Sequence, residues 1–317
     1  MPSRLPSRIT DRLRLPLIAA PMLRVSGPDL VIAACRAGAI GSFPTANART
    51  PEQLDDWLTT ISGTLGAGEA APYCPNLVIR QPDLAAHVEC LVRHRVEMVI
   101  TSVGSPATVV GPLHEVGTLV LADVATLVHA HKAVEAGADG LVLLTAGAGG
   151  QTGWLNGFAF VRAVREFFAG PIVLAGGISD GVALRAAITL GADLGYMGTR
   201  FIAATESMAA EGYRDLLISS CADDIVLTSA FTGLPTSMLR PAIEAAGLDP
   251  TKLDEQVTPA RADELFGGRS AGIGPKRWVD VYSAGHSVSG VRAVLPAAEI
   301  VAQTSREFTG AAESGVG

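Results

Sequence analysis

The sequence predicts an α/β protein whose eight parallel strands close into a TIM barrel, with a helical insertion or lid after the eighth strand. Short apolar segments alternate with helical patterns eight times along the chain, which is typical of a parallel sheet and matches the unit number of this barrel. Hydrophobic residues make up 48 % of the chain and charged residues 17 %, with 35 glycines, which suits buried strands under closely packed helices. A doubly wound sheet is the alternative, because the number of strands does not show closure.

The eight strands are expected where apolar runs end in polar or glycine-rich segments. They cover residues 15–22, 39–42, 73–78, 98–101, 118–122, 140–144, 171–175 and 194–197. Helices are expected at 29–37, 51–61, 81–94, 106–116, 125–136, 158–168 and 181–190. Thr50-Pro51 and Ser179-Asp180 are typical helix-starting pairs, with a capping side chain in each and a proline at the first helical position in one.

The segment after the eighth strand is too long for an ordinary connection. We expect residues 207–275 to form a helical lid or substrate subdomain over the barrel mouth. Residues 291–308 read as a closing helix, so the barrel domain comprises residues 1–206 and 276–317.

Net charge, hydropathy and cysteine content indicate which partners and sites are not expected for this chain. The net charge is −7 and no basic stripe is visible, which argues against nucleic acid as a partner. No apolar run is long enough to predict a membrane span. The four cysteines are scattered without metal-ligand spacing, so neither a disulfide framework nor a metal site is expected, and a reducing cytoplasm is the expected compartment. Arg4, Arg8, Arg12 and Arg14 are interpreted as a solvated lead-in.

Glycines at two adjacent strand ends predict a phosphate site. Gly176-Gly177 follows the seventh strand and precedes a helix, so backbone N–H groups and the helix dipole can face an anion. Gly198-Thr199 follows the eighth strand and adds further donors. The ends of these two strands form the usual phosphate site of the barrel. The alternative is that the glycines only make tight turns.

The loop after the sixth strand, residues 146–153, contains four glycines. Glycines at this density let the backbone approach a flat ligand closely. The alternative is a flexible loop without a binding role.

Several of these segments together resemble the nitronate monooxygenases. The resemblance rests on Ala20-Pro21-Met22, on the loop at 146–153, and on the segments at 175–180, 197–201 and 283–286. Flavin-dependent enoyl-ACP reductases share the pattern. The resemblance covers roughly residues 15–308 and implies an FMN-dependent enzyme that oxidises alkyl nitronates with O₂ to a carbonyl compound and nitrite. The alternative is an FMN reductase that uses NAD(P)H on quinones or enoyl thioesters. A homodimer is compatible with either activity.

The resemblance also implies the cofactor contacts. The glycine pairs would hold the FMN phosphate, the segment at 20–22 would lie against the isoalloxazine, and Asn76 would hydrogen-bond near it. The full set of implied cofactor residues is Ala20, Pro21, Met22, Asn76, Gly149, Gly150, Ala175, Gly176, Gly177, Met197, Gly198 and Thr199.

Two positions depart from the family pattern. Many relatives carry a histidine where this chain has Gln151, and some carry a lysine where it has Asp123. An amide cannot act as the base that deprotonates a neutral nitroalkane, but a nitronate is already deprotonated. Gln151 could still donate a hydrogen bond, or it could simply pack against the flavin, and Asp123 could be a helix N-cap. His286 is a further candidate, able to supply an imidazole if its segment returns to the barrel mouth. A flavin- or phosphate-binding sensor without catalysis is the remaining alternative.

Overall fold

The computed structural model describes residues 3–66, 68–267 and 274–313. Its main sheet contains eight parallel strands in the hydrogen-bonded order β2-β1-β9-β8-β6-β5-β4-β3. Isolated parallel bridges from Gly41 to Tyr73 and from Pro44 to Asn76 join the two outer strands, so the sheet closes and the predicted TIM barrel is confirmed. The strands are β1 (Leu17–Ala19), β2 (Ile40–Gly41), β3 (Asn76–Val78), β4 (Met98–Ser102), β5 (Leu119–Val124), β6 (Gly140–Leu144), β8 (Ile172–Ala175) and β9 (Leu194–Met197).

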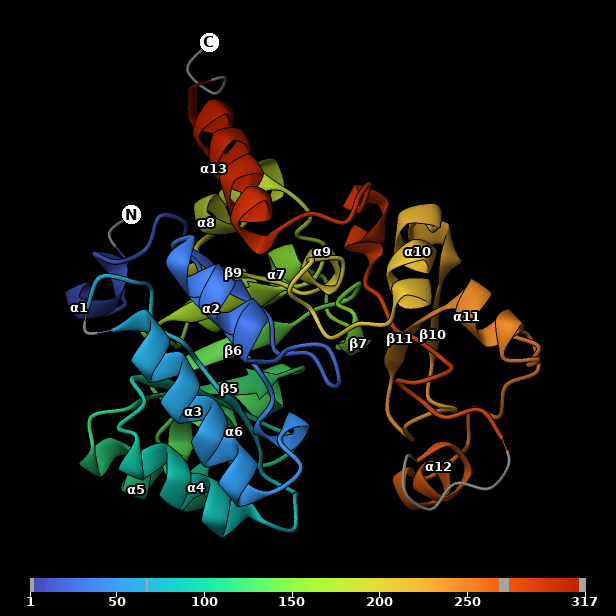
Figure 1. Cartoon of the computed structure of the whole chain (residues 1–317), viewed down its shortest axis with the longest axis horizontal. Helices are drawn as coiled ribbons and strands as arrows, with labels where there is room; N and C mark the ends of the chain where they lie inside the picture. Colours follow the sequence, from blue (N-terminus) through green and yellow to red (C-terminus); the bar gives the residue numbers. More distant parts are fainter. Residues whose placement is uncertain (1–2, 67, 268–273, 314–317) are drawn as a thin grey trace.

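Helices surround this sheet at the predicted places (Figure 1). The Thr50 side chain accepts a hydrogen bond from the Gln53 N–H and caps α3, while Asp180 caps α8 by accepting from the Ala183 N–H. The barrel helices are α2 (Pro28–Arg36), α3 (Pro51–Leu65), α4 (Leu84–Arg93), α5 (Ala107–Glu115), α6 (Leu127–Glu135), α7 (Gly157–Arg165) and α8 (Gly181–Leu190). The closing helix α13 (Ala297–Glu313) begins later than expected and packs against α8 and α2.

Successive side chains along each strand point alternately into the barrel and outward to the helices, so the apolar core has an inner and an outer layer. Ile18, Val142 and Val173 point into the barrel, whereas their neighbours along the same strands pack against the helices. Leu5 and Ile9, which flank and belong to α1 (Ser7–Thr10), join the interior cluster and cover the amino-terminal ends of the strands. Arg4, Arg8 and Arg14 are exposed as expected, but the segment is more than a solvated lead-in, because Leu5 and Ile9 fill the barrel floor.

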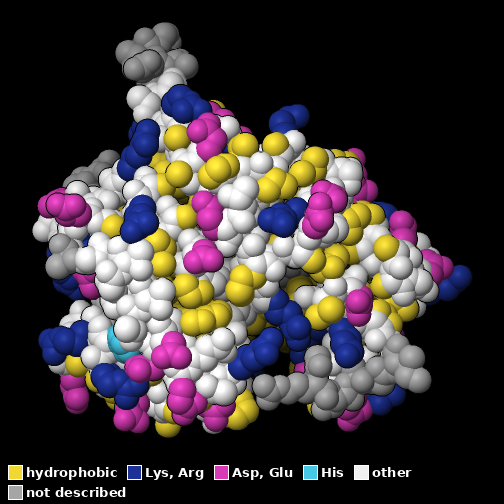
Figure 2. Space-filling model, viewed as in Figure 1, with side chains coloured by type: hydrophobic (Ala, Val, Ile, Leu, Met, Phe, Trp, Pro, Cys, Tyr) yellow, Lys and Arg dark blue, Asp and Glu magenta, His cyan; other side chains and the backbone are white. Residues whose placement is uncertain are grey.

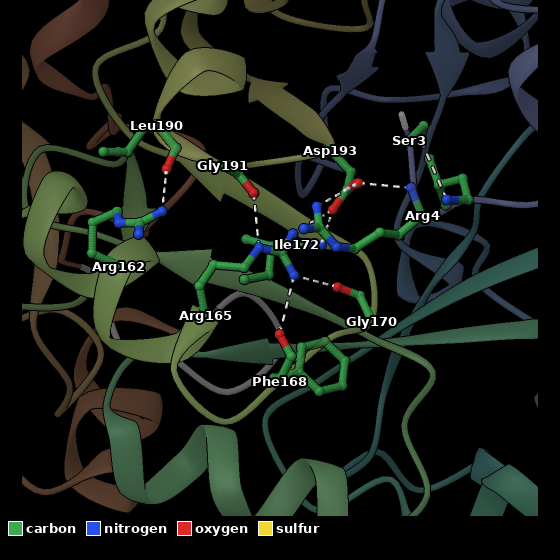
Figure 3. A network of polar contacts seen from close by, with 11 residues as sticks. Ser3, Arg4, Arg162, Arg165, Phe168, Gly170, Ile172, Leu190, Gly191 and Asp193 are labelled. Atoms are coloured by element: carbon green, nitrogen blue, oxygen red, sulfur yellow. Dashed lines mark hydrogen bonds and ion pairs between the residues drawn. The ribbon is translucent and has the colours of Figure 1, made fainter. Parts of the chain in front are cut away.

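A buried ion pair fixes the same end of the barrel (Figure 3). Asp193, whose side chain is 2 % exposed, accepts hydrogen bonds from Arg165 Nη2, the Ile172 N–H and the Arg4 N–H. Arg165 also donates to the carbonyl oxygens of Phe168, Gly170 and Gly191. The network joins α7, the start of β8 and the start of β9, which is the stability face of this fold rather than its catalytic face.

The insertion after β9 lies beside the barrel mouth and contains strands as well as helices (Figure 1). Its elements are α10 (Glu211–Ser219), β10 (Ile225–Thr228), β11 (Thr236–Leu239), α11 (Arg240–Ala245) and α12 (Pro259–Phe266). The expectation of helices alone is corrected, because β11 pairs with β10 on one side and with β7 (Gly150–Gln151), from the glycine-rich loop, on the other in a three-stranded antiparallel sheet. This sheet joins the insertion to the barrel mouth.

Short elements complete the chain. They are α9 (Thr199–Ile202) and the 3₁₀ turns η1 (Thr45–Asn47), η2 (Ala222–Asp224) and η3 (His286–Gly290). Among the described residues, none of the helices has the length and apolar character that crossing a bilayer requires.

Candidate functional site

A cavity of about 820 Å³ lies between the carboxyl ends of the barrel strands and the insertion. Figure 2 shows the corresponding hollow, with Lys and Arg side chains at its edge. The predicted site residues that line the cavity are Ala20, Pro21, Met22, Asn76, Asp123, Gly149, Gly150, Gln151, Ala175, Gly176, Gly177, Gly198 and Thr199. The structure thus brings together residues from the carboxyl ends of β1, β5, β8 and β9, from the start of β3, and from β7.

Two predicted residues lie outside this lining. Met197 faces the helices with 1 % of its surface exposed, because it follows the inward-facing Tyr196 on β9. His286 is exposed, and its backbone N–H donates to the Gly147 carbonyl oxygen at 2.9 Å. The prediction that Met197 contacts the cofactor is therefore wrong, because its side chain packs against the helices. The segment that contains His286 does return to the barrel mouth, but its imidazole does not line the cavity.

The glycines after β8 and β9 leave donors facing the cavity. Gly176 and Gly177 have φ of +119° and +74°, and a Cβ at Gly177 would meet no heavy atom within 4 Å. Within the described part of the chain, the backbone N–H groups of Gly176, Gly177 and Gly198 donate to no other group. The Thr199 hydroxyl accepts from the Gly285 N–H at 3.0 Å, so its own proton is free to be donated. Such a set of unpaired donors suits a phosphate.

The start of α8 does not contribute to this anion site as expected. Asp180 accepts from the Ala183 N–H at 2.8 Å, and Glu307 of α13 accepts from the Gly181 N–H at 2.9 Å. Two carboxylates thus already satisfy this helix end and its dipole. The α8 dipole is thus already opposed by two carboxylates, and the backbone N–H groups of the glycines are the donors that remain available to an anion.

The side chains of Asn47 and Ser26 hold the loop after β1 in shape. Asn47 Nδ2 donates to the carbonyl oxygens of Met22 and Ser26 at 2.9 and 2.8 Å, and the Ser26 hydroxyl accepts from the Met22 N–H. The segment at 20–22 therefore presents a fixed apolar wall to the cavity. Asn47 carried no recognisable signal in the sequence.

Asn76, at the start of β3, is a buried polar side chain on the cavity floor. Its Oδ1 accepts from the Ser102 hydroxyl at 3.0 Å. The bond orients the amide and leaves the Nδ2 hydrogens available to a ligand, because no described residue accepts from them.

Asp123 lies on the same floor. Two residues after the inward-facing Leu121, it points into the barrel by strand alternation, and its Oδ1 is buried without a hydrogen-bond partner among the described residues. Burial raises the pKa of Asp123 to about 8. It is not a helix cap, because Thr126 caps α6 by accepting from the His129 N–H.

Gln151 lines the cavity where β7 of the barrel loop meets the insertion. β7 pairs Gln151 with Thr236 of β11, and the residue is exposed to the cavity. The position predicted from the family pattern is thus at the cavity, with an amide that can donate and accept hydrogen bonds.

A segment at 283–286 closes the side of the mouth next to this loop. Gly285 bonds to Thr199, and a Cβ on Gly285 would come within 2.5 Å of the Gly147 carbonyl oxygen. Likewise, a Cβ on Gly149 would come within 2.7 Å of the Gly285 nitrogen. Gly147 and Gly149 therefore allow the loop after β6 to pack closely against the segment at 283–286. From the sequence alone, these glycines were explained only by the close approach of a flat ligand.

Gly285→Ala should destabilise the chain, because the added methyl group meets backbone atoms that cannot rotate away. Overpacking of this kind costs about 1–3 kcal/mol. Gly212→Ala on α10 is the control, since a Cβ there meets nothing within 4 Å and alanine favours the helix. Urea unfolding of both variants measures the difference, and equal stabilities would contradict the described packing.

Sequence reasoning missed the arginines at the cavity edge. Arg24, Arg80 and Arg277 line the cavity from three separate segments. Arg277 is paired with Asp263 and donates to the Phe231 carbonyl oxygen, whereas Arg24 and Arg80 form no ion pair with the described residues. No motif marks these arginines, because only the fold brings them to one opening.

The model of the nitronate monooxygenase family matches residues 69–307. The chain belongs to this family. Nitronate monooxygenase of Paraburkholderia phytofirmans is 29 % identical over 339 residues and covers 92 % of each chain. A solved structure of nitroalkane oxidase from Streptomyces ansochromogenes is 26 % identical, has a TM-score of 0.78, and covers 97 % of this chain and 99 % of its own.

A second solved structure, FabK from Thermotoga maritima, shares the fold. It has a TM-score of 0.80 at 24 % identity and covers 99 % of this chain and 98 % of its own. Membership of the nitronate monooxygenase family makes the chain an oxidoreductase.

Proposed function

We propose that this member of the nitronate monooxygenase family binds FMN and oxidises alkyl nitronates with O₂ to a carbonyl compound and nitrite. The observation that supports this most directly is the set of unpaired backbone donors at Gly176, Gly177 and Gly198, at the edge of an 820 Å³ cavity. One terminal phosphate fits these donors, and no motif for the adenosine of FAD is visible in the sequence.

The residues present fit an FMN molecule. The glycine pairs would hold its phosphate, the wall at 20–22 would lie against the ring, and the Asn76 Nδ2 hydrogens would meet the acceptors at the ring edge. When bound, the flavin supplies the electron acceptor for the substrate and the site of reaction with O₂. We assign the barrel domain to residues 1–206 and 276–317, and the lid or substrate subdomain to 207–275.

The protein's own contribution to the reaction is mainly electrostatic. Arg24 and Arg80 at the opening attract an anionic nitronate. The Gln151 amide can donate a hydrogen bond to a nitro oxygen without removing a proton. Since a nitronate has already lost its α-proton, the reaction with this form requires no base at position 151.

Anaerobic reduction of the bound flavin tests the activity. A nitronate, NADH and NADPH are each added to the purified protein, and flavin absorbance is followed. Reduction by the nitronate alone is expected. Reduction only by NADH or NADPH would overturn the oxidase proposal in favour of the reductase, and mass spectrometry of the released cofactor showing FAD would overturn the choice of FMN.

Gln151→His should raise turnover of neutral nitroalkane selectively. A positioned general base is worth about 10²–10⁴-fold, and we expect a gain near the lower end because the loop is not shaped to orient an imidazole. Steady-state kinetics with freshly prepared neutral nitroalkane and with the pre-formed nitronate separate the two effects. Gln151→Asn is the control, as it retains an amide, and equal use of both forms by the wild type would show that another residue is the base.

A further inference from the structure

Asp123 is a buried acid that the proposed reaction does not use. It lines the floor of the cavity, and its Oδ1 is enclosed without a hydrogen-bond partner among the described residues. Buried carboxyl oxygens are normally paired, so an unpaired one that borders a cavity points to a partner supplied by the ligand.

The surroundings of Asp123 favour its neutral form. Burial alone raises its pKa to about 8, and no described Lys, Arg or His forms an ion pair with it. The titratable groups that interact with it are the Cys74 thiol and the Tyr196 hydroxyl, both with pKa values raised well above their ordinary range by burial. Neither group loses its proton near pH 8, so Asp123 is the group that changes charge on this floor.

The order of the strands separates Asp123 from the glycines that would hold the flavin phosphate. The glycine pairs end β8 and β9, and Asp123 lies near the end of β5, with β6 between β5 and β8. Two strand spacings separate β5 from β8, or about 10 Å. Asn76 lies on the same side, at the start of β3. A mononucleotide held by its phosphate at the glycines would extend its ring towards these two side chains.

We propose that the side chain of Asp123 keeps its proton and, as a neutral carboxyl group, donates a hydrogen bond to a polar atom at the edge of the flavin ring. When Asp123 releases this proton to solvent, the donor is lost and a carboxylate is left facing the ring. Flavin affinity and flavin reduction potential then both fall with rising pH. This proposal rests on the FMN site proposed above.

The direction of the pH effect follows from linkage. A flavin that accepts a hydrogen bond from the neutral acid raises the pKa of Asp123 in the complex. The affinity for FMN is therefore highest below about pH 8, which is the pKa of Asp123 in the free protein. The affinity falls as the pH rises from there towards the higher pKa of Asp123 in the complex. In that window the dissociation constant should rise about tenfold per pH unit, and the second ionisation of the FMN phosphate, near pH 6, lies outside it.

Reduction adds negative charge to the flavin and should raise the pKa of Asp123 again. Reduction then takes up an additional proton at pH values between the pKa of Asp123 in the oxidised complex and its higher pKa in the reduced complex. The equilibrium constant for reduction should fall about an extra tenfold per pH unit, which is about 30 mV per unit for a two-electron couple.

Asp123→Asn is the test variant, because it keeps the shape and an N–H donor but cannot titrate. FMN is removed and titrated back from pH 6.5 to 9.5 by fluorescence quenching, and the potential is measured by spectroelectrochemistry. We expect the FMN affinity of the wild type to fall above about pH 8 and that of Asp123→Asn to stay constant over the same pH range. Asp56→Asn, the same change at an exposed carboxylate of α3 that does not line the cavity, should behave as the wild type.

A second measurement does not depend on any variant. Calorimetric titration of the wild-type protein with FMN at pH 8.5, in buffers of different ionisation heat, should show uptake of a fraction of a proton. Identical pH profiles in the wild type and Asp123→Asn, or no proton uptake, would overturn the role of Asp123 while leaving the FMN site intact. A protein that binds no FMN at any pH would instead overturn the proposed function.

Discussion

Gly177→Asp is expected to lower the affinity for FMN by about a thousandfold. At 4 Å and an effective dielectric constant near 20, two like charges repel by about 4 kcal/mol, which corresponds to this factor. A Cβ at Gly177 meets nothing within 4 Å, so the carboxylate would occupy the space assigned to the phosphate without a steric clash. Gly177→Asn is the matched control, because asparagine also tolerates the φ of +74° but carries no charge.

Gly198 provides an independent comparison. A Cβ there would lie 3.5 Å from Ala20 Cβ and 3.7 Å from Met22 Sδ, which are ordinary contacts, and the φ is −102°. Gly198→Ala should therefore keep FMN while Gly198→Asp loses it. The measurement is a fluorescence titration of the flavin-free protein, and stoichiometric FMN in either aspartate variant would refute the phosphate assignment at that position.

Arg165→Ala is expected to reduce the free energy of unfolding by about 3–5 kcal/mol, because it leaves Asp193 charged and buried. The Asp193 side chain is 2 % exposed, and its remaining donors are the Ile172 and Arg4 backbone and the guanidinium of Arg4 at 3.5 Å. The Arg165 side chain is 7 % exposed, and this burial lowers its pKa. Denaturant unfolding with the cofactor removed measures the loss directly.

Arg93→Ala is the control for this change. Arg93 pairs with Asp55 at 2.8 Å, but 57 % of its side chain is exposed, so its loss should cost less than about 1 kcal/mol. Comparable losses in both variants would show that the buried network does not stabilise the barrel. Since the network lies at the opposite end of the strands from the cavity, the FMN affinity of folded Arg165→Ala should be unchanged.

The fold was predictable because its signals are local. Each strand is a short apolar run, and capping pairs such as Thr50-Pro51 act within one helical turn. The glycine pairs were found for the same reason, since their place after β8 and β9 follows from counting strands. Gln151 and Asp123 were located by comparison with a family pattern, and the structure places both at the cavity.

The remaining features depend on contacts between distant segments. β7 exists because Gly150-Gln151 finds a partner in β11, and neither segment has enough alternation to indicate this by itself. Glu307 neutralises the start of α8 from a helix more than a hundred residues away. Met197 was misplaced because the prediction treated the end of a strand as one site, although neighbouring residues face opposite sides.

The closing segment at 283–286 has a consequence for the order in which the molecule is completed. All eight barrel strands and the segments Gly176-Gly177 and Gly198-Thr199 precede residue 200, but part of the cavity lining comes from Ser283, Ala284 and Ser287. The bond from Gly285 to Thr199 and the packing of α13 on α8 and α2 follow later still. During synthesis, a barrel that already has its phosphate donors must therefore wait for about another hundred residues, or roughly 5–20 s at ordinary elongation rates, before its mouth is whole. We therefore expect the proposed cofactor to be retained only after this C-terminal segment has been synthesised.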